Sequence, residues 1–252
     1  MASEDRAAIV TGAASGIGRA ITERLRSDGV QVLAVDRAEQ PDGGEHQLAT
    51  DLTTREGNRL AVDTALQRFG RLDIVVANAG FQHVAPIEKF EPDRWDELIS
   101  ILLTSPFLLA HYGWPALTEA GGRALGGRFL AIASTHGLLA SPYKVGYVSA
   151  KHGVLGLIKT LAVEGADVGV SATALCPGYV RTPLVEAQIA DQARAHQLPE
   201  DQVLAEVILA RQAVKRLLEP AEVADAAAFL LGPSGAGFTG ATVPMDHGWT
   251  AR

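Results

Sequence analysis

Two residues able to exchange protons, Tyr147 and Lys151, are four positions apart, and Ser134 lies upstream at the end of an apolar run. Because positions i and i+4 share one face of a helix, we expect the Lys151 ammonium close to the Tyr147 phenol. A nearby cation favours phenolate, so Lys151 is expected to lower the pKa of Tyr147 and allow proton exchange near neutral pH. With Ser134 as a second donor to the same substrate oxygen, the set suits alcohol oxidation or carbonyl reduction beside a hydride carrier. Tyr-x-x-x-Lys also occurs in ordinary surface helices, so whether this pair is catalytic depends on the elements around it.

The elements that position these residues follow from the hydrophobic pattern. Short apolar runs alternate with longer amphipathic stretches, which predicts βαβ units, a parallel sheet and helices on both of its faces. We predict one doubly wound α/β domain of the Rossmann type over residues 1–252. Its strands are expected at 7–11, 30–35, 73–77, 129–133 and 170–175, with a further strand before Asp51, and its helices at 16–28, 55–69, 93–112, 146–165 and 220–231.

Residues 178–219 leave this alternation. They carry two polar segments of helical character, near 183–196 and 200–216. A helical insertion beside the expected site is typical of a segment that closes over a substrate, so we predict a lid over residues 183–216.

A glycine-rich loop follows the first expected strand and opens the first expected helix. Its glycines let the backbone turn tightly and approach a pyrophosphate closely. The helix N-terminus then offers free N–H groups and the positive end of its dipole to that anion. The alternative is a strand–helix turn without a ligand. The residues expected to bind the nucleotide here are Gly12, Ser15, Gly16, Ile17 and Gly18.

Asp36 ends the second expected strand, where an acid can accept hydrogen bonds from both ribose hydroxyls and repel a 2′-phosphate. This favours NAD over NADP, although Arg37 partly offsets the repulsion. The alternative for Asp36 is a helix cap or a solvated turn residue. The residues that follow the third and fourth strands are also expected beside the cofactor, namely Asp51, Leu52, Asn78, Ala79 and Gly80.

The composition excludes several classes of partner. The net charge of −7 and the pI near 5.5 argue against binding to nucleic acid or to an anionic membrane surface. The single cysteine, Cys176, excludes an internal disulfide framework and a cysteine-based zinc site, and it is expected to be a small buried hydrophobe. No metal site is predicted. Neither a signal pattern nor an apolar run of about 20 residues is found, so a cytoplasmic protein is the default expectation.

Taken together, these features resemble the classical short-chain dehydrogenase/reductase family over essentially the full length of the chain. The matching residues are the 11–18 loop, Asn78-Ala79-Gly80, Ser134, Tyr147 with Lys151, and Pro177-Gly178 with Thr182.

This resemblance implies a nicotinamide cofactor, with Tyr147 as general acid/base, Lys151 bound to the nicotinamide ribose and Ser134 orienting the substrate oxygen. It also implies a homotetramer, with the helices near 93–112 and 146–165 at interfaces. The apolar residues Leu155, Ile158 and Leu161 could equally belong to the core. The residues that it adds beside the cofactor are Pro177, Gly178, Val180 and Thr182.

Within the family, several segments resemble the D-3-hydroxybutyrate dehydrogenase group, namely 81–87, 134–138, 177–188 and 248–252. In that group a short hydroxy acid is held by its carboxylate, and the matching residues here are Gln82, His136, Lys144 and Gln188. A carboxylate needs charge-assisted donors, and a lysine supplies one. Each of these residues could instead be a solvated polar residue of a loop or helix that binds no ligand.

Three positions depart from the family pattern. Leu102 stands where Asn usually holds a water near Lys151, and leucine has no donor or acceptor, so the proton route is an open question. Pro106 is expected to interrupt or kink the same helix. Tyr179 stands where the hydroxybutyrate group has Trp beside the substrate methyl, and His247 stands where the family often has Gly, which suggests a packing or interface role.

Three functions therefore stay open. The leading one is an NAD-dependent oxidoreductase that interconverts a short 3-hydroxy acid and its 3-keto acid. The second is a reductase of 3-oxoacyl thioesters or of other ketones. The third, supported by Leu102, is a dinucleotide-binding protein with impaired catalysis.

Overall fold

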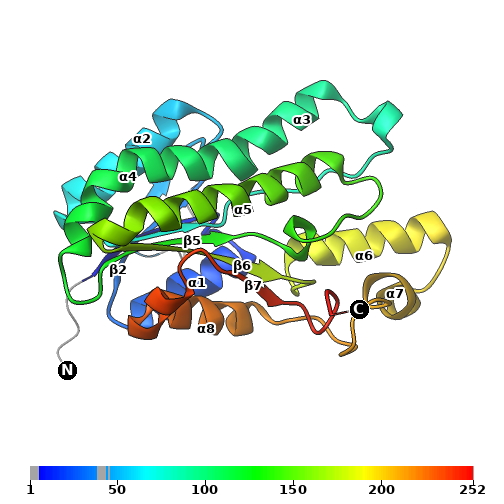
Figure 1. Ribbon diagram of the computed structural model, residues 1–252. Coiled ribbons are helices and arrows are strands. Elements are labelled where there is room, and N and C mark those ends of the chain that lie inside the picture. The colour runs from blue at the N-terminus through cyan, green and yellow to red at the C-terminus, as the bar shows by residue number, and fades with distance from the viewer. Residues whose placement is uncertain (1–5, 39–43, 45, 252) are drawn as a thin grey trace.

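The computed structural model describes residues 6–38, 44 and 46–251, and its strands form one parallel sheet (Figure 1). Within these residues seven strands pair in the order β3-β2-β1-β4-β5-β6-β7. The order reverses direction at β1, as in a doubly wound fold, so the predicted Rossmann-type architecture is confirmed. The strands are β1 (Ala7–Thr11), β2 (Gln31–Asp36), β3 (Gln47–Ala49), β4 (Ile74–Ala77), β5 (Gly127–Ile132), β6 (Val170–Pro177) and β7 (Thr242–Met245).

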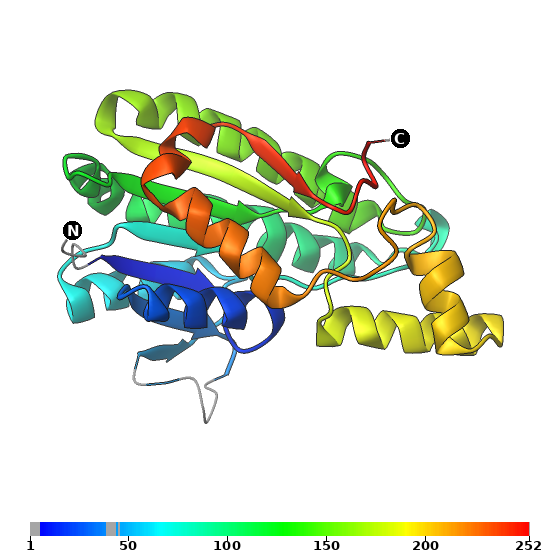
Figure 2. The same cartoon turned by 90° about the horizontal axis from the view of Figure 1, so that it is seen from below.

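Helices cover both faces of the sheet (Figures 1 and 2). One face carries α2 (Arg55–Phe69), α4 (Ser105–Gly121) and α5 (Val145–Gly165), and the other carries α1 (Gly16–Ser27) and α8 (Pro220–Leu231). Alternate strand residues face opposite layers: Ile9 packs in the first and Val10 in the second. The three residues whose place was open lie in the core of the first layer: Leu155, Ile158 and Leu161.

The helix predicted over 93–112 is divided at its centre. It consists of α3 (Pro92–Ile99), a π-helical turn η2 (Ser100–Thr104) and α4. The backbone N–H of Ser105 bonds the carbonyl of Ser100, five residues back. Pro106 lies directly after this widened turn and has no N–H of its own, so it accounts for the predicted interruption.

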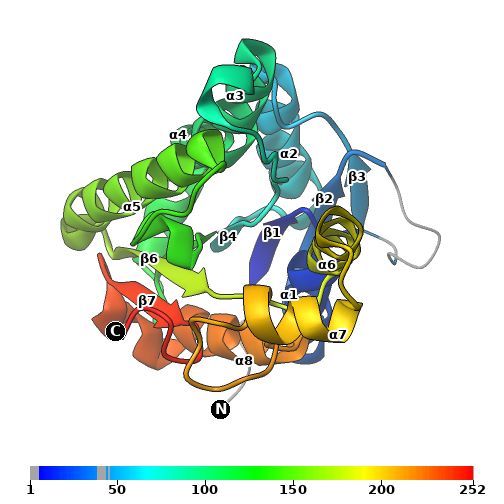
Figure 3. The same cartoon turned by 90° about the vertical axis from the view of Figure 1, so that its right-hand side faces the viewer.

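The lid region lies at the carboxyl ends of the strands, beside the opening of the sheet (Figure 3). Its first helix, α6 (Pro183–His196), has the predicted bounds and begins at Thr182, whose hydroxyl accepts a hydrogen bond from the Val185 N–H. The segment predicted as a lid forms an apolar cluster together with Leu217; the members are Val185, Ile189, Val203, Ile208, Leu209 and Leu217.

The second lid helix, predicted over 200–216, is shorter than expected. It comprises α7 (Glu200–Val203) and the π turn η5 (Leu204–Ile208). The prediction was wrong beyond residue 208 because two contacts end the helix there. Lys215 donates to the carbonyls of Leu209 and Ala210, and the backbone N–H groups of residues 213 and 214 bond the distant His247 carbonyl.

The last strand, β7, and several single turns were not predicted. β7 contains Pro244, which lacks a ladder donor and is tolerated because β7 is an edge strand. His247 follows it at φ +54°, a left-handed conformation that glycine adopts readily, and its Nδ1 lies 3.0 Å from the Arg216 carbonyl oxygen. This gives His247 the expected packing role. The single turns are η1 (Ile87–Lys89), η3 (Thr135–Gly137), η4 (Ala166–Val168) and η6 (Pro233–Phe238).

In the described part of the chain, no helix has the length and apolar character needed to cross a membrane.

Asp73, which is 2% exposed, ties the amino end of the sheet together. Its carboxylate accepts hydrogen bonds from the Ala7 N–H at 2.8 Å, from Arg71 at 2.8 Å to each oxygen, and from Arg123 at 2.9 Å. Burial alone would raise the pKa of this carboxyl, but the donors outweigh burial and hold the pKa below its ordinary value of 3.8.

Replacing Asp73 by Asn is expected to lower the free energy of unfolding by about 3 kcal/mol at pH 7, because two arginines lose a buried counter-charge. Since the pKa is lower in the folded than in the unfolded state, this contribution is present above about pH 4 and is lost as the pH falls. Urea unfolding at pH 7 and pH 3.5 measures both effects. Asp167→Asn, at an exposed acid of η4, is the matched control, and equal stabilities at pH 7 would contradict the prediction.

Candidate active site

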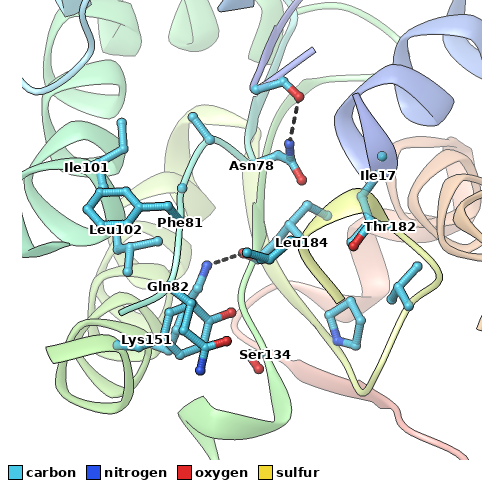
Figure 4. A pocket seen from close by; sticks show the side chains of 18 of the residues that line it. Ile17, Asn78, Phe81, Gln82, Ile101, Leu102, Ser134, Lys151, Thr182 and Leu184 are labelled. Carbon is cyan, nitrogen blue, oxygen red and sulfur yellow. Dashed lines mark hydrogen bonds between the residues drawn. The ribbon is translucent and has the colours of Figure 1, made fainter. Parts of the chain in front are cut away.

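A cavity of about 580 Å³ opens at the carboxyl ends of the strands, and almost every predicted site residue lines it (Figure 4). One end lies at Asp36 and Asp51, and the other lies at Tyr147 and Lys144. β1, β2 and β4 supply the first end, and β5, α5 and the lid supply the second. The structure therefore brings together the residues predicted for cofactor and for substrate: Gly12, Ser15, Gly16, Ile17, Asp36, Asp51, Leu52, Asn78, Ala79, Gly80, Gln82, Ser134, His136, Lys144, Tyr147, Lys151, Pro177, Gly178, Tyr179, Val180, Thr182 and Gln188.

Gly18 is the predicted cofactor residue that lies beneath the loop instead of at the cavity wall. A Cβ there would lie 2.1 Å from the carbonyl oxygen of Gly12, so glycine permits the first helix to pack against its own loop. Gly12 is needed for a different reason, because it has φ +66° and passes closely over Asn78. The Asn78 amide donates to the Thr11 carbonyl at 2.8 Å and ties the loop to the end of β4 (Figure 4).

The two acids at the far end of the cavity are held by backbone donors. Asp36 accepts hydrogen bonds from the N–H groups of Ala14 at 2.9 Å and Arg37 at 2.7 Å, which ties β2 to the glycine-rich loop. Asp51 accepts two from Thr53, and these lower its pKa. A glycine cradle at a helix N-terminus and a carboxylate at the end of β2 form a donor and acceptor set that fits a dinucleotide.

Ser134, Tyr147 and Lys151 meet where β5 ends and α5 begins. The Lys151 ammonium donates to the Ile132 carbonyl at 2.6 Å and lies 5.7 Å from the centroid of the Tyr147 ring. The Ser134 hydroxyl accepts the His136 N–H at 3.1 Å and caps the turn η3. The i, i+4 spacing thus brings Lys151 to the phenol ring as predicted.

The expected lowering of the Tyr147 pKa is not what the structure shows. Burial raises the pKa of Tyr147, and the nearby Ser134 hydroxyl offsets only part of that rise. Burial also lowers the pKa of Lys151 to about 8. The sequence argument counted the attraction between the charges, whereas both groups also lose water, and that loss disfavours the charged form of each.

The residues expected to hold a carboxylate converge from three segments. Gln188 on α6 donates to the Gln82 side-chain oxygen at 2.7 Å (Figure 4). The Gln82 amide nitrogen is buried, and within the described residues it has no hydrogen-bond partner. Lys144 is half-buried, its ammonium lies 5.7 Å from the centroid of the Tyr179 ring, and burial lowers its pKa. Dehydrated donors of this kind gain most from an anionic ligand.

His136 differs from these donors because both of its ring nitrogens face serines. Its Nδ1 lies 3.4 Å from the Ser134 Oγ, and its Nε2 lies 3.0 Å from the Ser141 Oγ. The imidazole therefore lines the cavity with its ring rather than with a free N–H.

Trp249 is a cavity residue to which the sequence argument assigned no role. It is 6% exposed, stacks on Tyr179 at 5.3 Å and meets the edge of His136 at 5.5 Å. A signal was present, since Trp249 stands in a segment that carries the family resemblance. Only the fold, however, brings this C-terminal residue to His136 and to Tyr179. Three apolar residues also line the cavity: Phe81, Ile101 and Leu102. The sequence argument singled out Leu102 but assigned no role to Phe81 or Ile101.

Comparison with known proteins agrees with this fold and site. A family model described as enoyl-(acyl carrier protein) reductase matches residues 12–250. The D-beta-hydroxybutyrate dehydrogenase of Rhizobium meliloti (strain 1021) is 40% identical over 260 residues, covering 98% of this chain and 99% of that protein. The enzyme of the same name from Cupriavidus necator is 37% identical, covering 98% of each. An acetoacetyl-CoA reductase of Rhizobium meliloti (strain 1021) is 34% identical, covering 96% of this chain and 98% of that protein.

Solved structures show the same architecture. The ligand-free aldohexose dehydrogenase of Thermoplasma acidophilum superposes with a TM-score of 0.91 at 26% identity, covering 99% of this chain and 95% of that one. A Beutenbergia cavernae protein with bound NADP, described as an NAD(P)-dependent gluconate 5-dehydrogenase, has a TM-score of 0.84 at 33% identity, covering 98% and 97%. The chain belongs to the short-chain dehydrogenase/reductase family of oxidoreductases, whose members bind a nicotinamide dinucleotide.

Proposed function

We propose that this enzyme uses NAD to interconvert a short 3-hydroxy acid, D-3-hydroxybutyrate in the first place, and its 3-keto acid. The observation that carries the proposal is the position of dehydrated donors, Lys144 and Gln82, beside Ser134 and Tyr147 at one end of a dinucleotide cleft. The two relatives named D-beta-hydroxybutyrate dehydrogenase support the same substrate.

The glycine-rich loop and Asp36 would hold a nicotinamide dinucleotide, which would supply the hydride chemistry at the carbinol carbon. Tyr147 takes the hydroxyl proton during oxidation and returns it during reduction. Ser134 donates a hydrogen bond to the same oxygen and keeps it against Tyr147. Lys151, held by the Ile132 carbonyl, places a positive charge beside the phenol ring when it is ionised. The apolar wall that includes Leu102 excludes water from the reacting oxygen.

The substrate carboxylate would bind Lys144, with the Gln82 and Gln188 amides as neutral donors. The unpaired Gln82 nitrogen gains an acceptor in this arrangement, which removes the cost of a buried donor without a partner. Tyr179 and Trp249 stack as an aromatic wall beside Lys144 and would face the short acyl chain.

The position of Asp36 supports NAD as the cofactor. Asp36 lines the cavity, and backbone N–H groups of Ala14 and Arg37 hold its carboxylate there. A negative charge at the end of β2 would accept hydrogen bonds from ribose hydroxyls and would repel a 2′-phosphate. The Beutenbergia cavernae protein has NADP bound, so membership of the family does not by itself select NAD.

Replacing Asp36 by Ala is expected to reduce the preference for NAD over NADP about 10- to 100-fold, because it removes charge-assisted bonds to the ribose and the repulsion of a phosphate. The ratio of kcat/KM for the two cofactors measures the effect. Asp51→Ala, at the second acid of the cavity, is the matched comparison and is expected to change the ratio less. An unchanged preference in Asp36→Ala would show that another residue selects the cofactor.

A second candidate is reduction of a 3-oxoacyl thioester, which the acetoacetyl-CoA reductase relative favours. A thioester lacks the free carboxylate that Lys144 and Gln82 are placed to receive. Measuring kcat/KM for D-3-hydroxybutyrate, its L-enantiomer and acetoacetyl-CoA distinguishes the two candidates. We expect NADH formation with the D-acid. If the protein binds NAD but turns over neither these compounds nor an uncharged secondary alcohol, the third candidate, a dinucleotide-binding protein with impaired catalysis, is favoured.

We further propose that the chain acts as one catalytic domain, with residues 183–216 as its lid, in a homotetramer. Exposed apolar side chains support two interfaces: Phe107 and Val163 on α4 and α5, and the Phe229–Phe238 pair beside β7. Light scattering in solution tests the assembly. The one cysteine, Cys176, is a buried free thiol, which fits a reducing compartment, and the cytoplasm is the proposed location.

A further inference from the structure

Three side chains connect the reacting phenol with the surface. Ser134 and Tyr147 line the same end of the cavity, and the Ser134 hydroxyl opposes the rise in the pKa of Tyr147. Nδ1 of His136 lies 3.4 Å from the Ser134 Oγ, and Nε2 of His136 lies 3.0 Å from the Ser141 Oγ. Ser141 is half-buried, in the loop before α5, and stands behind the cavity wall rather than in it. We propose that Ser134, His136 and Ser141 form a proton path between the Tyr147 phenol and solvent.

The other side of the phenol is dry. Leu98, Leu102 and Ala150 form a buried apolar cluster against which Tyr147 and Phe81 pack. Lys151, on the same side, is buried and donates to the Ile132 carbonyl. A proton that leaves Tyr147 in this direction meets hydrocarbon instead of water, whereas the proton path offers a polar atom at each step.

The hydrogen-bond directions suit a transfer. The Ser134 oxygen accepts the His136 backbone N–H, and its single hydroxyl proton can rotate from the substrate oxygen toward Nδ1 as the substrate gives up its own proton. Burial lowers the pKa of His136 to about 4, and the neighbouring Lys144 and His152 charges act in the same direction. The ring is therefore neutral at neutral pH, with one nitrogen that accepts and one that donates. The other groups around it are the rings of Tyr147 and Trp249.

Burial keeps Tyr147 protonated, so in each oxidation it takes the substrate hydroxyl proton as it gives up its own phenolic proton. Tyr147 passes it to the Ser134 oxygen, Ser134 gives its own proton to Nδ1 of His136, Nε2 gives a proton to Ser141, and Ser141 gives one to water. Every group gains and loses one proton, nothing along the path is oxidised or reduced, and reduction uses the steps in reverse. After product release the ring returns to its starting tautomer: Nε2 takes a proton from water through Ser141, and Nδ1 returns one through Ser134 to water in the open cavity.

The path rests on the proposed function for its substrate, and Ser141 provides the test because it lies outside the cavity. In Ser141→Ala, kcat for oxidation is expected to fall about tenfold, with KM for D-3-hydroxybutyrate within about twofold. In weakly buffered stopped-flow experiments with a pH indicator, the wild type releases the proton together with NADH formation. In Ser141→Ala proton release lags behind NADH, and added imidazole restores both the lag and kcat.

Two further variants distinguish the loss of the Ser141 hydroxyl from a structural change in the loop. Ser141→Thr keeps the hydroxyl and is expected to match the wild type, as is Ser149→Ala at an exposed serine of α5. A wild-type rate and proton timing in Ser141→Ala, or a Ser141→Thr variant as slow as Ser141→Ala, would overturn the proposal. The wild-type rate of hydroxy acid oxidation tests the proposed function. The ratio of kcat in Ser141→Ala to kcat in the wild type tests the proton path. If hydroxy acids are not oxidised, an uncharged secondary alcohol serves for the same ratio.

Discussion

Replacing Tyr147 by Phe is expected to lower kcat about a hundred- to ten-thousand-fold while NAD still binds with nearly the wild-type affinity. In the proposed mechanism the phenol oxygen takes the substrate proton, and Phe removes this oxygen while keeping the ring that packs against Leu98 and Ala150. Steady-state NADH formation measures the first effect, and quenching of protein fluorescence by NADH measures the second.

The matched control is Tyr143→Phe, four residues earlier, where an exposed side chain loses the same oxygen. It is expected to keep wild-type turnover. Turnover retained in Tyr147→Phe would remove Tyr147 from the mechanism, and loss of NAD binding in the same variant would point to a structural role instead.

Replacing Lys144 by Met is expected to lower kcat/KM for D-3-hydroxybutyrate about 30- to 1,000-fold, since it removes one partner of a partly buried charge pair. Met keeps most of the aliphatic stem that lies against Tyr179. An uncharged ketone lacks the carboxylate, so its kcat/KM is expected to stay within about threefold.

Lys159→Met, at an exposed lysine of α5, controls for the loss of one positive charge and is expected to be neutral. Equal losses on the charged and uncharged substrates in Lys144→Met would argue against a carboxylate site and in favour of a thioester or general ketone as substrate. The two outcomes therefore separate the two candidate functions.

The elements that carry the site could be predicted because their signals are local. β1, α2 and α8 have the predicted bounds, since apolar periodicity is written along consecutive residues. Local patterns also placed the glycine-rich loop, Asp36 and the Tyr147–Lys151 pair. Each depends on a strand end, a helix start or an i, i+4 spacing, and these involve only residues close in sequence. β7 was missed because the proline of an edge strand weakens that local signal.

What the tertiary structure decided depends on residues distant in sequence and on the loss of water. Burial sets the direction of the Tyr147 pKa shift, and the spacing of residues along the chain does not show how much water a side chain loses. The His247 carbonyl ends the second lid helix, and Trp249 crosses from the C-terminus to the substrate end of the cavity. Ser141 turns His136 from an expected carboxylate donor into a ring with a partner on each nitrogen. The chain by itself therefore determines the protein's family and the groups proposed to react, because these follow from local patterns. The fold determines how far burial shifts the pKa values of those groups and which partners they meet.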